Sequence, residues 1–506
     1  MMTMALLPIV ALQTPTLGVS VNLSQTTAIS PYVYGTNDSD WRGRQRYQTL
    51  YRWGGNRTTA YNWENNASNA GSDYQHQNDS YLGGGEKPLE AIYLQAKYPL
   101  SYGAAVLITV PTIGYVAADK NGGGDVSQTP NYLQTRFKVS RPFKGSALSS
   151  TPNLSDGYVN QDEFVYSVRK RFGANKTIFY ALDNEPDLWQ ETHARIHPNN
   201  PTYEEIAVRS RDYAKAIKSG DPNGLVFGPV SYGWSGFQQL QNASDANGRF
   251  FLDWYMARMK QESATAGKRL LDVLDLHWYP EARGAGKRIT QTGTEPGLID
   301  ARVQAPRSLW DPTYTEDSWI AQYATSGPIK LVPRMFDKIS ANYAGTKLAF
   351  TEWNFGGGDQ IDGGVTVADV LGVFGREGVF AANYWELRDD ESYAYGGFDM
   401  FRNFDQKGAA FGDLSAKVTN ANPVAISVYA SKDSTQTNRR VFVIINKSRT
   451  ESRRVELSGV GTATSVRGYR LFDGYSKPRA GQVGLPVGGV LSVTVPKMSV
   501  FTVELK

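Results

Sequence analysis

Short apolar segments alternate with amphipathic helical patterns between residues 32 and 385, and this alternation constrains the fold more than any other feature. Continuous runs of aliphatic, β-branched and aromatic residues are typical of buried strands. Strands that alternate with helices form parallel βαβ units, and eight such units predict an α/β fold with a closed (β/α)8 barrel over residues 32–412. The eight predicted strands cover residues 32–35, 50–57, 104–110, 177–182, 225–230, 271–279, 347–352 and 378–385.

The pattern changes after about residue 411. Short, partly alternating runs follow at 423–429, 440–445, 453–457 and 490–495, parted by Gly, Asn, Ser and Lys, and no helical periodicity accompanies them. Such runs predict an antiparallel β-sandwich over residues 413–506. One or two strands from residues 14–31 are predicted to complete it.

The composition excludes several classes of function. The 506 residues carry a net charge of +4 with no basic run, so a nucleic-acid partner is not expected. No apolar span is long enough for a membrane helix, and the absence of cysteine excludes disulfides and thiolate chemistry. The apolar residues 1–13 lack Lys and Arg, so they are interpreted as a trimmed or incomplete signal peptide. A monomer is expected.

The strand that begins at Thr177 ends in the polar sequence Asp183-Asn184-Glu185-Pro186-Asp187. Pro186 disfavours the helical conformation at Glu185, so we expect an extended Glu185 with its carboxylate at the mouth of the strand. Parallel barrels present catalytic acids at the C-terminal ends of their strands. The alternative is a polar turn without function.

A second glutamate, Glu352, ends the predicted seventh strand, 167 residues after Glu185. Only a barrel whose fourth and seventh strands face each other brings the two glutamates together. Carboxyl groups about 5–5.5 Å apart suit retaining hydrolysis of a glycosidic bond, whereas about 6.5–9.5 Å suits inversion. The sequence leaves this distance open.

Several neighbours strengthen the pairing of these two glutamates. Asn184 is a candidate for bonding a sugar 2-hydroxyl, Tyr279 for donating to Glu352, and Arg52 for an ion pair with Glu352. Trp385 ends the eighth strand, where an indole would form the floor of a sugar subsite. Each has an ordinary structural alternative. Further candidates for a supporting or cleft-lining role are Trp53, Asn56, Trp63, Trp189, His277 and Trp353.

Four long segments resemble glycoside hydrolase family 44: residues 51–71, 182–189, 271–283 and 305–314. The resemblance implies endo-acting hydrolysis of β-1,4-glucans with retention, on a barrel joined to a β-sandwich. It implies that Glu185 is the acid/base and that Glu352 is the nucleophile. An acidic residue would be expected nearer the position of Asn354, which leaves the subsite preference open.

The predicted function is therefore a retaining endo-β-1,4-glucanase acting on cellulose-type polysaccharides or oligosaccharides. The resemblance adds carboxymethyl cellulose, lichenan, xyloglucan and xylan as candidate substrates. One alternative is a xylanase or mannanase that uses the same two carboxylates, and another is a carbohydrate-binding barrel without turnover. A polymeric substrate that cannot enter a cell predicts a secreted enzyme.

Two weaker patterns concern metals, although no cofactor is expected for the chemistry. His193 and His197 have the spacing of a zinc site on a helix, but Pro198 favours plain hydrogen bonding. Asn153 and Asp156, together with a distant acid such as Glu86, offer oxygen ligands for calcium. The family resemblance supports a structural calcium, whereas the residues alone predict a solvated turn.

Overall fold

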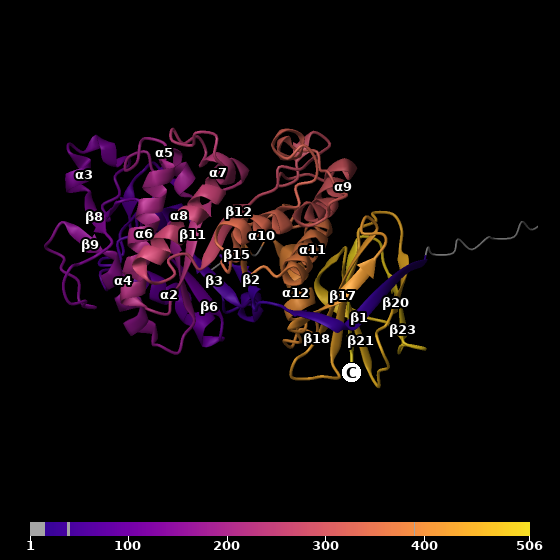
Figure 1. The fold of residues 1–506 in the computed structure, drawn as a ribbon. Helices are drawn as coiled ribbons and strands as arrows, with labels where there is room; N and C mark the ends of the chain where they lie inside the picture. The colour runs from indigo at the N-terminus through magenta and orange to yellow at the C-terminus, as the bar shows by residue number, and fades with distance from the viewer. Residues whose placement is uncertain (1–15, 38–40, 389) are drawn as a thin grey trace, which may run out of the picture.

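The computed structural model describes residues 16–37, 41–388 and 390–506, so the predicted signal-peptide remnant lies outside the described residues. Its main feature is a closed barrel of eight parallel strands, which confirms the predicted (β/α)8 fold (Figure 1). In order around the barrel the strands are β2 (Tyr32–Thr36), β3 (Leu50–Trp53), β6 (Ala105–Val110), β10 (Ile178–Leu182), β11 (Leu225–Ser231), β12 (Val273–Trp278), β15 (Lys347–Trp353) and β16 (Ala381–Tyr384). Each strand overlaps one of the eight predicted segments, and β2, β11 and β15 each extend one residue further.

Helices surround this barrel and cover the outward-facing residues of its strands (Figure 1). The helix α6 shows how the sequence begins one of them, because the Thr202 side chain accepts a hydrogen bond from the Glu205 N–H at 3.1 Å. The longer helices are α2 (Glu90–Ser101), α4 (Gln161–Phe172), α6 (Tyr203–Gly220), α8 (Phe251–Ala266), α9 (Pro296–Gln304), α10 (Leu331–Asn342), α11 (Ile361–Glu377) and α12 (Ser392–Arg402). No helix among the described residues combines the length and apolarity needed to span a membrane.

The interior of the barrel changes from apolar to polar along the strands. A cluster that includes Leu50, Leu107, Phe179 and Phe227 fills the lower part. Because inward-facing residues recur every second position, the next inward residue on each strand lies one layer higher. On six strands that residue is polar and buried: Arg52, Thr109, Asp183, Asp275, Thr351 and Asn383. This polar layer forms the floor of the site described below.

The second structural unit is one hydrogen-bonded sheet of nine strands in the order β22-β21-β24-β19-β18-β17-β1-β20-β23. The N-terminal strand β1 lies inside it, antiparallel to β17 and parallel to β20. The strands are β1 (Thr16–Ala28), β17 (Leu414–Asn420), β18 (Ile426–Lys432), β19 (Arg440–Asn446), β20 (Arg453–Ser458), β21 (Val466–Phe472), β22 (Tyr475–Gly481), β23 (Val490–Val495) and β24 (Ser499–Leu505). The exact domain limits, 32–412 and 413–506, stay predictions.

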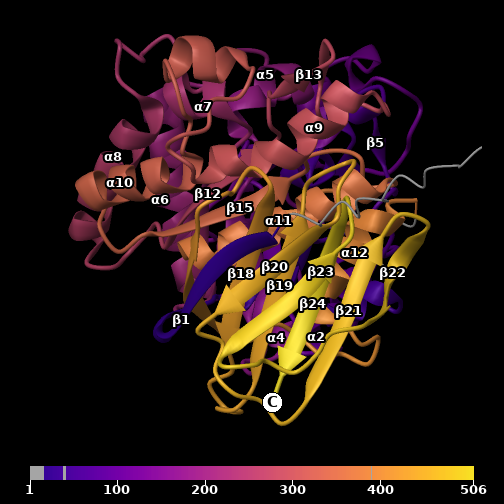
Figure 2. The same cartoon turned by 90° about the vertical axis from the view of Figure 1, so that its right-hand side faces the viewer.

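The central strands β18, β19 and β24 of this sheet are buried on both faces. In β19, Phe442 and Ile444 belong to a core within the sheet unit, whereas Val441, Val443 and Ile445 belong to the core shared with the barrel. This explains the uninterrupted apolar run of β19. Helices α11 and α12 lie behind the sheet in Figure 2.

Polar contacts also join the sheet to helix α11. The Tyr429 hydroxyl donates to Asp369 Oδ1 at 2.6 Å, and Lys447 Nζ lies 2.7 Å from Asp369 Oδ2. A Cβ at Gly372 would lie 2.3 Å from the Tyr429 ring, so a glycine in α11 makes room for this contact. The sheet is thus fixed to the barrel by an apolar core and by a buried ion pair.

Candidate active site

Glu185 lies in a turn between β10 and the 3-10 helix η4 (Pro186–Leu188). Its backbone has φ +45° and ψ +57°, which is left-handed, so the predicted extended conformation is wrong. The proline excludes the right-handed helical region but does not select between the others. Here a hydrogen bond of 3.0 Å from the Glu185 N–H to the Val230 oxygen supports the left-handed turn. The carboxyl group consequently faces the centre of the barrel mouth.

The two aspartates that flank Glu185 hold this turn in place. Asp183 accepts hydrogen bonds from the backbone N–H groups of Thr112 and Ile113. Asp187 accepts from the Ser231 hydroxyl, and a Cβ at Gly236 would lie only 1.8 Å from Asp187 Oδ2. Neighbouring loops on both sides therefore brace the turn, and the polar cluster is a supported structure rather than a solvated turn.

Glu352 faces the same space because the pairing of β12 with β15 is irregular. Leu276 pairs with Phe350 and His277 pairs with Glu352, so Thr351 is an extra residue in β15. Such a bulge allows two consecutive residues to face the barrel interior. Thr351 accordingly donates to Asp275 Oδ1 at 2.8 Å, while Glu352 lies one layer higher.

Two groups donate hydrogen bonds to the Glu352 carboxylate. Arg52 Nη1 lies 2.6 Å from Oε1, and the Tyr279 hydroxyl lies 2.9 Å from Oε2. Both contacts were expected from the sequence. A guanidinium and a hydroxyl donor stabilise the ionised form of a carboxyl group over the neutral form.

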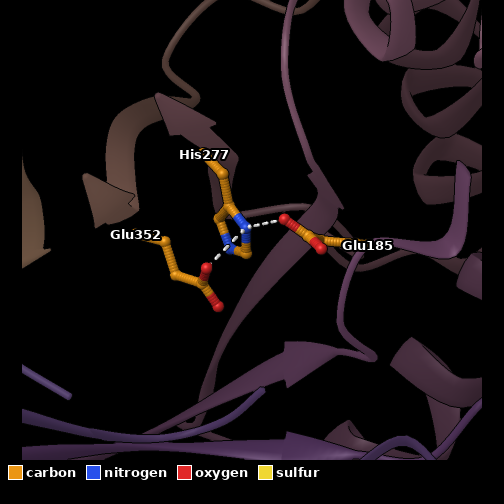
Figure 3. A group of neighbouring side chains, drawn as sticks. All are labelled: Glu185, His277 and Glu352. Carbon is orange, nitrogen blue, oxygen red and sulfur yellow. Dashed lines mark hydrogen bonds and ion pairs between the residues drawn. The ribbon is translucent and has the colours of Figure 1, made fainter. Parts of the chain in front are cut away.

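His277 lies between the two glutamates (Figure 3). Its Nδ1 is 2.8 Å from Glu185 Oε1 and 3.4 Å from Glu352 Oε2. Burial lowers the pKa of His277 to about 3, so the imidazole is neutral. Since Nε2 has no partner among the described residues, we place the single ring proton on Nδ1, where it is donated to Glu185. The ring therefore orients the Glu185 carboxyl group.

The two carboxyl groups differ in their electrostatic surroundings. Burial raises the pKa of Glu185 to about 7; Arg52 opposes this shift, and Asp73 adds to it. Glu352, by contrast, contacts the Arg52 cation directly. One oxygen of Glu185, one of Glu352 and a ring nitrogen of His277 all lie within 4.8 Å of one another. Glu185 is therefore suited to hold a proton near neutral pH, close to a second carboxyl group that is bonded to a fixed cation.

A cleft lies beside these residues, and its lining includes Tyr279 and Arg52, the two donors to Glu352. It consists of two hollows of about 490 and 470 Å³ that share Trp385, which is partly exposed as expected for the floor of a sugar subsite. Tyr279 and Asn354 line the first hollow, and Arg52 and Asn56 line the second. At Gly55, with φ +92°, a Cβ would lie 2.7 Å from the Trp385 ring.

The structure contradicts the cleft-lining role predicted for most tryptophans. Trp63 and Trp189 are at most 1 % exposed, and Trp353 is fully buried in the core, so none of them stacks on a ligand. Trp53 borders the second hollow but is only 2 % exposed. For Trp53 and Trp353 the reason is their position along the strand. They directly follow the inward-facing residues Arg52 and Glu352, so their side chains face outward towards the helices.

Two exposed aromatic residues in the second hollow were not predicted from the sequence. Tyr74 and Tyr81 are 52 % and 74 % exposed, and the Arg57 guanidinium lies 4.0 Å from the centre of the Tyr81 ring. They belong to an irregular loop rich in Asn, Asp and Gly, where no periodic pattern marks a side chain as cleft-facing. Only the folded loop shows that they border the cleft.

The candidate metal ligands are engaged otherwise. The two ring nitrogens of His197 form hydrogen bonds with the Asn199 oxygen and with the Glu205 carboxylate, which agrees with the hydrogen-bonding interpretation. For calcium, Glu86 pairs with Lys120, and Asn153 donates to Asp156 at 3.1 Å. Across the described residues, Glu185, His277 and Glu352 form the one group of three acidic or histidine side chains that meet closely. The Arg52 guanidinium already supplies a positive charge beside the Glu352 carboxylate of this group.

The chemistry that this arrangement suits is cleavage of a glycosidic bond. That reaction needs a neutral acid at the leaving oxygen and an ionised partner close to it, on a scaffold that holds both rigidly. The fold and the site together thus define a glycoside hydrolase of the (β/α)8 class.

Comparison with known proteins gives the family. Residues 67–282 match the model for glycoside hydrolase family 44. The chain is 39 % identical over 510 residues to endoglucanase A of Paenibacillus lautus, covering 96 % of this chain and 71 % of the relative. It belongs to glycoside hydrolase family 44.

Two further relatives agree with this assignment. A solved structure of a Paenibacillus polymyxa xyloglucanase of family 44 with xyloglucan is 38 % identical, with a TM-score of 0.92, and the match covers 97 % of this chain and 99 % of that one. The beta-mannanase/endoglucanase A of Caldicellulosiruptor saccharolyticus is 38 % identical over 94 % of this chain. The chain spans 37 % of that longer relative.

Proposed function

We propose that the protein is a retaining endo-β-1,4-glucanase that cleaves cellulose-type polysaccharides, including xyloglucan, lichenan and carboxymethyl cellulose. The names of the relatives support a glucan substrate, since they include endoglucanases and a xyloglucanase. The observation that carries the retaining mechanism is the approach of Glu185 and Glu352 oxygens to within 4.8 Å. Inverting pairs leave room for a water and lie about 6.5–9.5 Å apart.

In the first step Glu352 acts as the nucleophile. A carboxylate oxygen of Glu352 attacks the anomeric carbon while the glycosidic oxygen takes the proton of Glu185 and leaves. The bond between the anomeric carbon and that oxygen breaks, and an ester between Glu352 and the sugar forms. Arg52 and Tyr279 hold the attacking carboxylate in one orientation.

In the second step the roles of the carboxyl groups change. Glu185, now ionised, removes a proton from a water whose oxygen attacks the anomeric carbon. The ester bond breaks, Glu352 becomes a carboxylate again, and Glu185 regains its proton. Two inversions at one carbon give net retention.

The test of this proposal is the configuration of the first product. We expect wild-type enzyme to cleave xyloglucan or carboxymethyl cellulose internally and to release new chain ends in the β-configuration, because the two displacements restore the starting geometry. Proton NMR during the first minutes of hydrolysis, before mutarotation, measures this. A first product in the α-configuration would contradict the retaining mechanism.

The preferred polysaccharide is a separate question. A xylanase or mannanase would use the same two carboxylates, and one relative carries the name beta-mannanase as well as endoglucanase. We infer a glucan preference from the other relatives, and reducing-sugar assays on xyloglucan, lichenan, xylan and mannan test it. A faster rate on xylan or mannan than on any glucan would overturn that preference.

The pH dependence follows from the pKa of Glu185, which burial raises to about 7. The first step needs protonated Glu185, so kcat/KM is expected to fall as the pH rises through about 7. With a substrate whose leaving group needs no protonation, this alkaline limb should disappear. Profiles from pH 4 to 9 on both kinds of substrate measure the effect, and full activity at pH 9 on the polysaccharide would contradict the assignment.

Three further statements belong to the same proposal. We infer secretion from the polymeric substrate, and we expect a monomer. A structural calcium near Glu86, Asn153 and Asp156 is proposed from the family resemblance alone, and metal analysis of the purified protein tests it.

A further inference from the structure

A chain of hydrogen bonds leads from Glu352 to an exposed carboxylate in the cleft. Arg52 donates to Glu352 at 2.6 Å and, through Nη2, to Asn184 Oδ1 at 2.7 Å. Asn184 Nδ2 donates to Asn56 Oδ1 at 3.3 Å, and Asn56 Nδ2 donates to Asp73 Oδ1 at 2.8 Å. Asn184 and Asn56 therefore both point their amide oxygen towards Arg52 and their amide N–H towards Asp73.

The chemistry at the two ends makes this direction the only consistent one. A guanidinium only donates hydrogen bonds, so the Asn184 oxygen must face Arg52. An ionised carboxylate only accepts them, so the Asn56 amide nitrogen must face Asp73. The Asn56 oxygen is then left to accept from the Asn184 nitrogen. Without Asp73, the Asn56 amide could turn over and present its own N–H groups to Asn184.

The Asn184–Asn56 contact is the longest of the chain, and it lies where a ligand would enter. Asn56, Arg52 and Asp73 all line the hollow of about 470 Å³ next to Trp385. A hydrogen bond of 3.3 Å is long for an amide pair, so a better acceptor readily replaces it. A sugar hydroxyl in the catalytic subsite is such an acceptor.

We propose that Asp73 is a positioning residue for catalysis: by fixing the direction of the Asn56 amide, it keeps the Asn56 oxygen, and not the Asn56 N–H groups, facing the Asn184 nitrogen. Asp73 thereby keeps the Asn184 N–H, whose direction Arg52 sets, aligned for the 2-hydroxyl of the reacting glucose. The inference rests on the proposed function, because it needs a sugar in this subsite. Hydrogen bonds to the 2-hydroxyl strengthen as the transition state forms, so their alignment affects the rate more than the binding of the ground state.

The loop that carries Asp73 is fixed by its surroundings. Asp73 ends the 3-10 helix η2 (Gly71–Asp73), which packs against α5 (Trp189–Thr192) just beyond Glu185. At Gly71, where φ is +54°, a Cβ would lie 2.3 Å from the Thr192 oxygen and 3.0 Å from His193 Nε2. A glycine at this position lets η2 approach α5 closely, and this contact holds the Asp73 carboxylate in place beside Asn56.

Asp73 also provides an electrostatic readout of its own. Its negative charge raises the pKa of Glu185, so removal of that charge should lower this pKa and shift the alkaline limb of kcat/KM to lower pH. A purely structural role in the loop would not move the limb. The titratable and charged groups around Glu185 are Arg52, Asp73, Asp187, His277, Tyr279 and Glu352.

The test combines two substitutions with two substrates. Asp73→Ala removes the acceptor and the charge, whereas Asp73→Asn keeps an acceptor oxygen for Asn56 and removes only the charge. The substrates are an aryl β-cellotetraoside and its analogue without the 2-hydroxyl on the reacting glucose. On the parent substrate, Asp73→Ala should lose about tenfold in kcat, as for one aligned hydrogen bond, and Asp73→Asn at most about threefold. On the deoxy analogue, neither should lose activity relative to wild type.

Glu191→Gln is the matched control, because Glu191 is an exposed acid in α5 near Glu185 that does not affect the pKa of Glu185. Both Asp73 variants should shift the alkaline limb, and the Glu191 variant should not. Equal losses on both substrates, or an unshifted limb, would overturn the proposal while the proposed function stands. A wild-type enzyme that fails to cleave the parent substrate would overturn both.

Discussion

Replacement of Glu352 by alanine is expected to lower kcat by about 10⁴-fold or more, because the reacting nucleophile is lost. On an activated aryl glycoside, azide should restore turnover by entering the space left by the side chain, and the product should be the α-glycosyl azide. Glu185→Ala should form the glycosyl ester but hydrolyse it slowly. Azide should then attack that ester and give the β-glycosyl azide.

The opposite configurations of the two azides distinguish the roles of the two glutamates, and proton NMR of the products reads them. Glu352→Asp serves as a control, since it keeps the carboxylate but withdraws it by one methylene, and it should remain insensitive to azide. Near-wild-type turnover in either alanine variant would mean that the glutamate concerned is not catalytic. The same azide anomer from both variants would contradict double displacement.

Arg52→Ala is expected to have the second largest effect. Arg52 is 1 % exposed and donates to Glu352, Asn184 and Asn37, so its loss leaves a buried carboxylate without a counter-ion. Loss of one preorganised electrostatic contact of this kind costs about 10²–10³-fold in kcat. Breaking a buried ion pair also destabilises the fold by about 3–5 kcal/mol. Thermal unfolding and steady-state kinetics measure the two effects.

A pH profile separates a catalytic role of Arg52 from a purely structural one. Arg52 opposes the upward shift in the pKa of Glu185, so the alkaline limb of Arg52→Ala should move to higher pH, the reverse of the Asp73 variants. Arg439→Ala is the control, because Arg439 forms a similarly buried pair with Glu504 in the sheet unit, 2.7 Å apart. It should lower stability but leave kcat unchanged. Unchanged kcat in Arg52→Ala would contradict the proposed positioning of Glu352.

Much of the barrel could be predicted because its signals are local. Each of the eight strands is a short apolar run bounded by turn residues, and burial of a strand on both faces needs only that run. Glu185 and Glu352 stood out for the same reason, since each is an acid at the end of such a run. The contact of Glu352 with Tyr279 then followed from neighbouring strands, whereas Arg52, on a strand that is not a neighbour of β15, was a candidate because of its charge.

The errors arose where side-chain direction depends on register or on contacts between distant segments. Trp63 and Trp189 were predicted to line the cleft because aromatic residues in polar loops suit sugar binding, yet they are buried. The left-handed turn at Glu185 depends on the Val230 oxygen, which belongs to another strand. Asp73 carried no signal at all, because it reaches Asn184 only through Asn56, and the three residues come from separate segments of the chain.

The sequence by itself determined the barrel, the mainly antiparallel strands of the C-terminal unit and the position of two glutamates at strand ends, because burial and strand periodicity follow from runs of adjacent residues. The tertiary structure decided how these glutamates differ. The bulge at Thr351 turns Glu352 inward, and His277 and Arg52 reach the two carboxyl groups from different strands. Proton affinity depends on burial and on charges a few ångströms away, and those distances exist only once the barrel has closed.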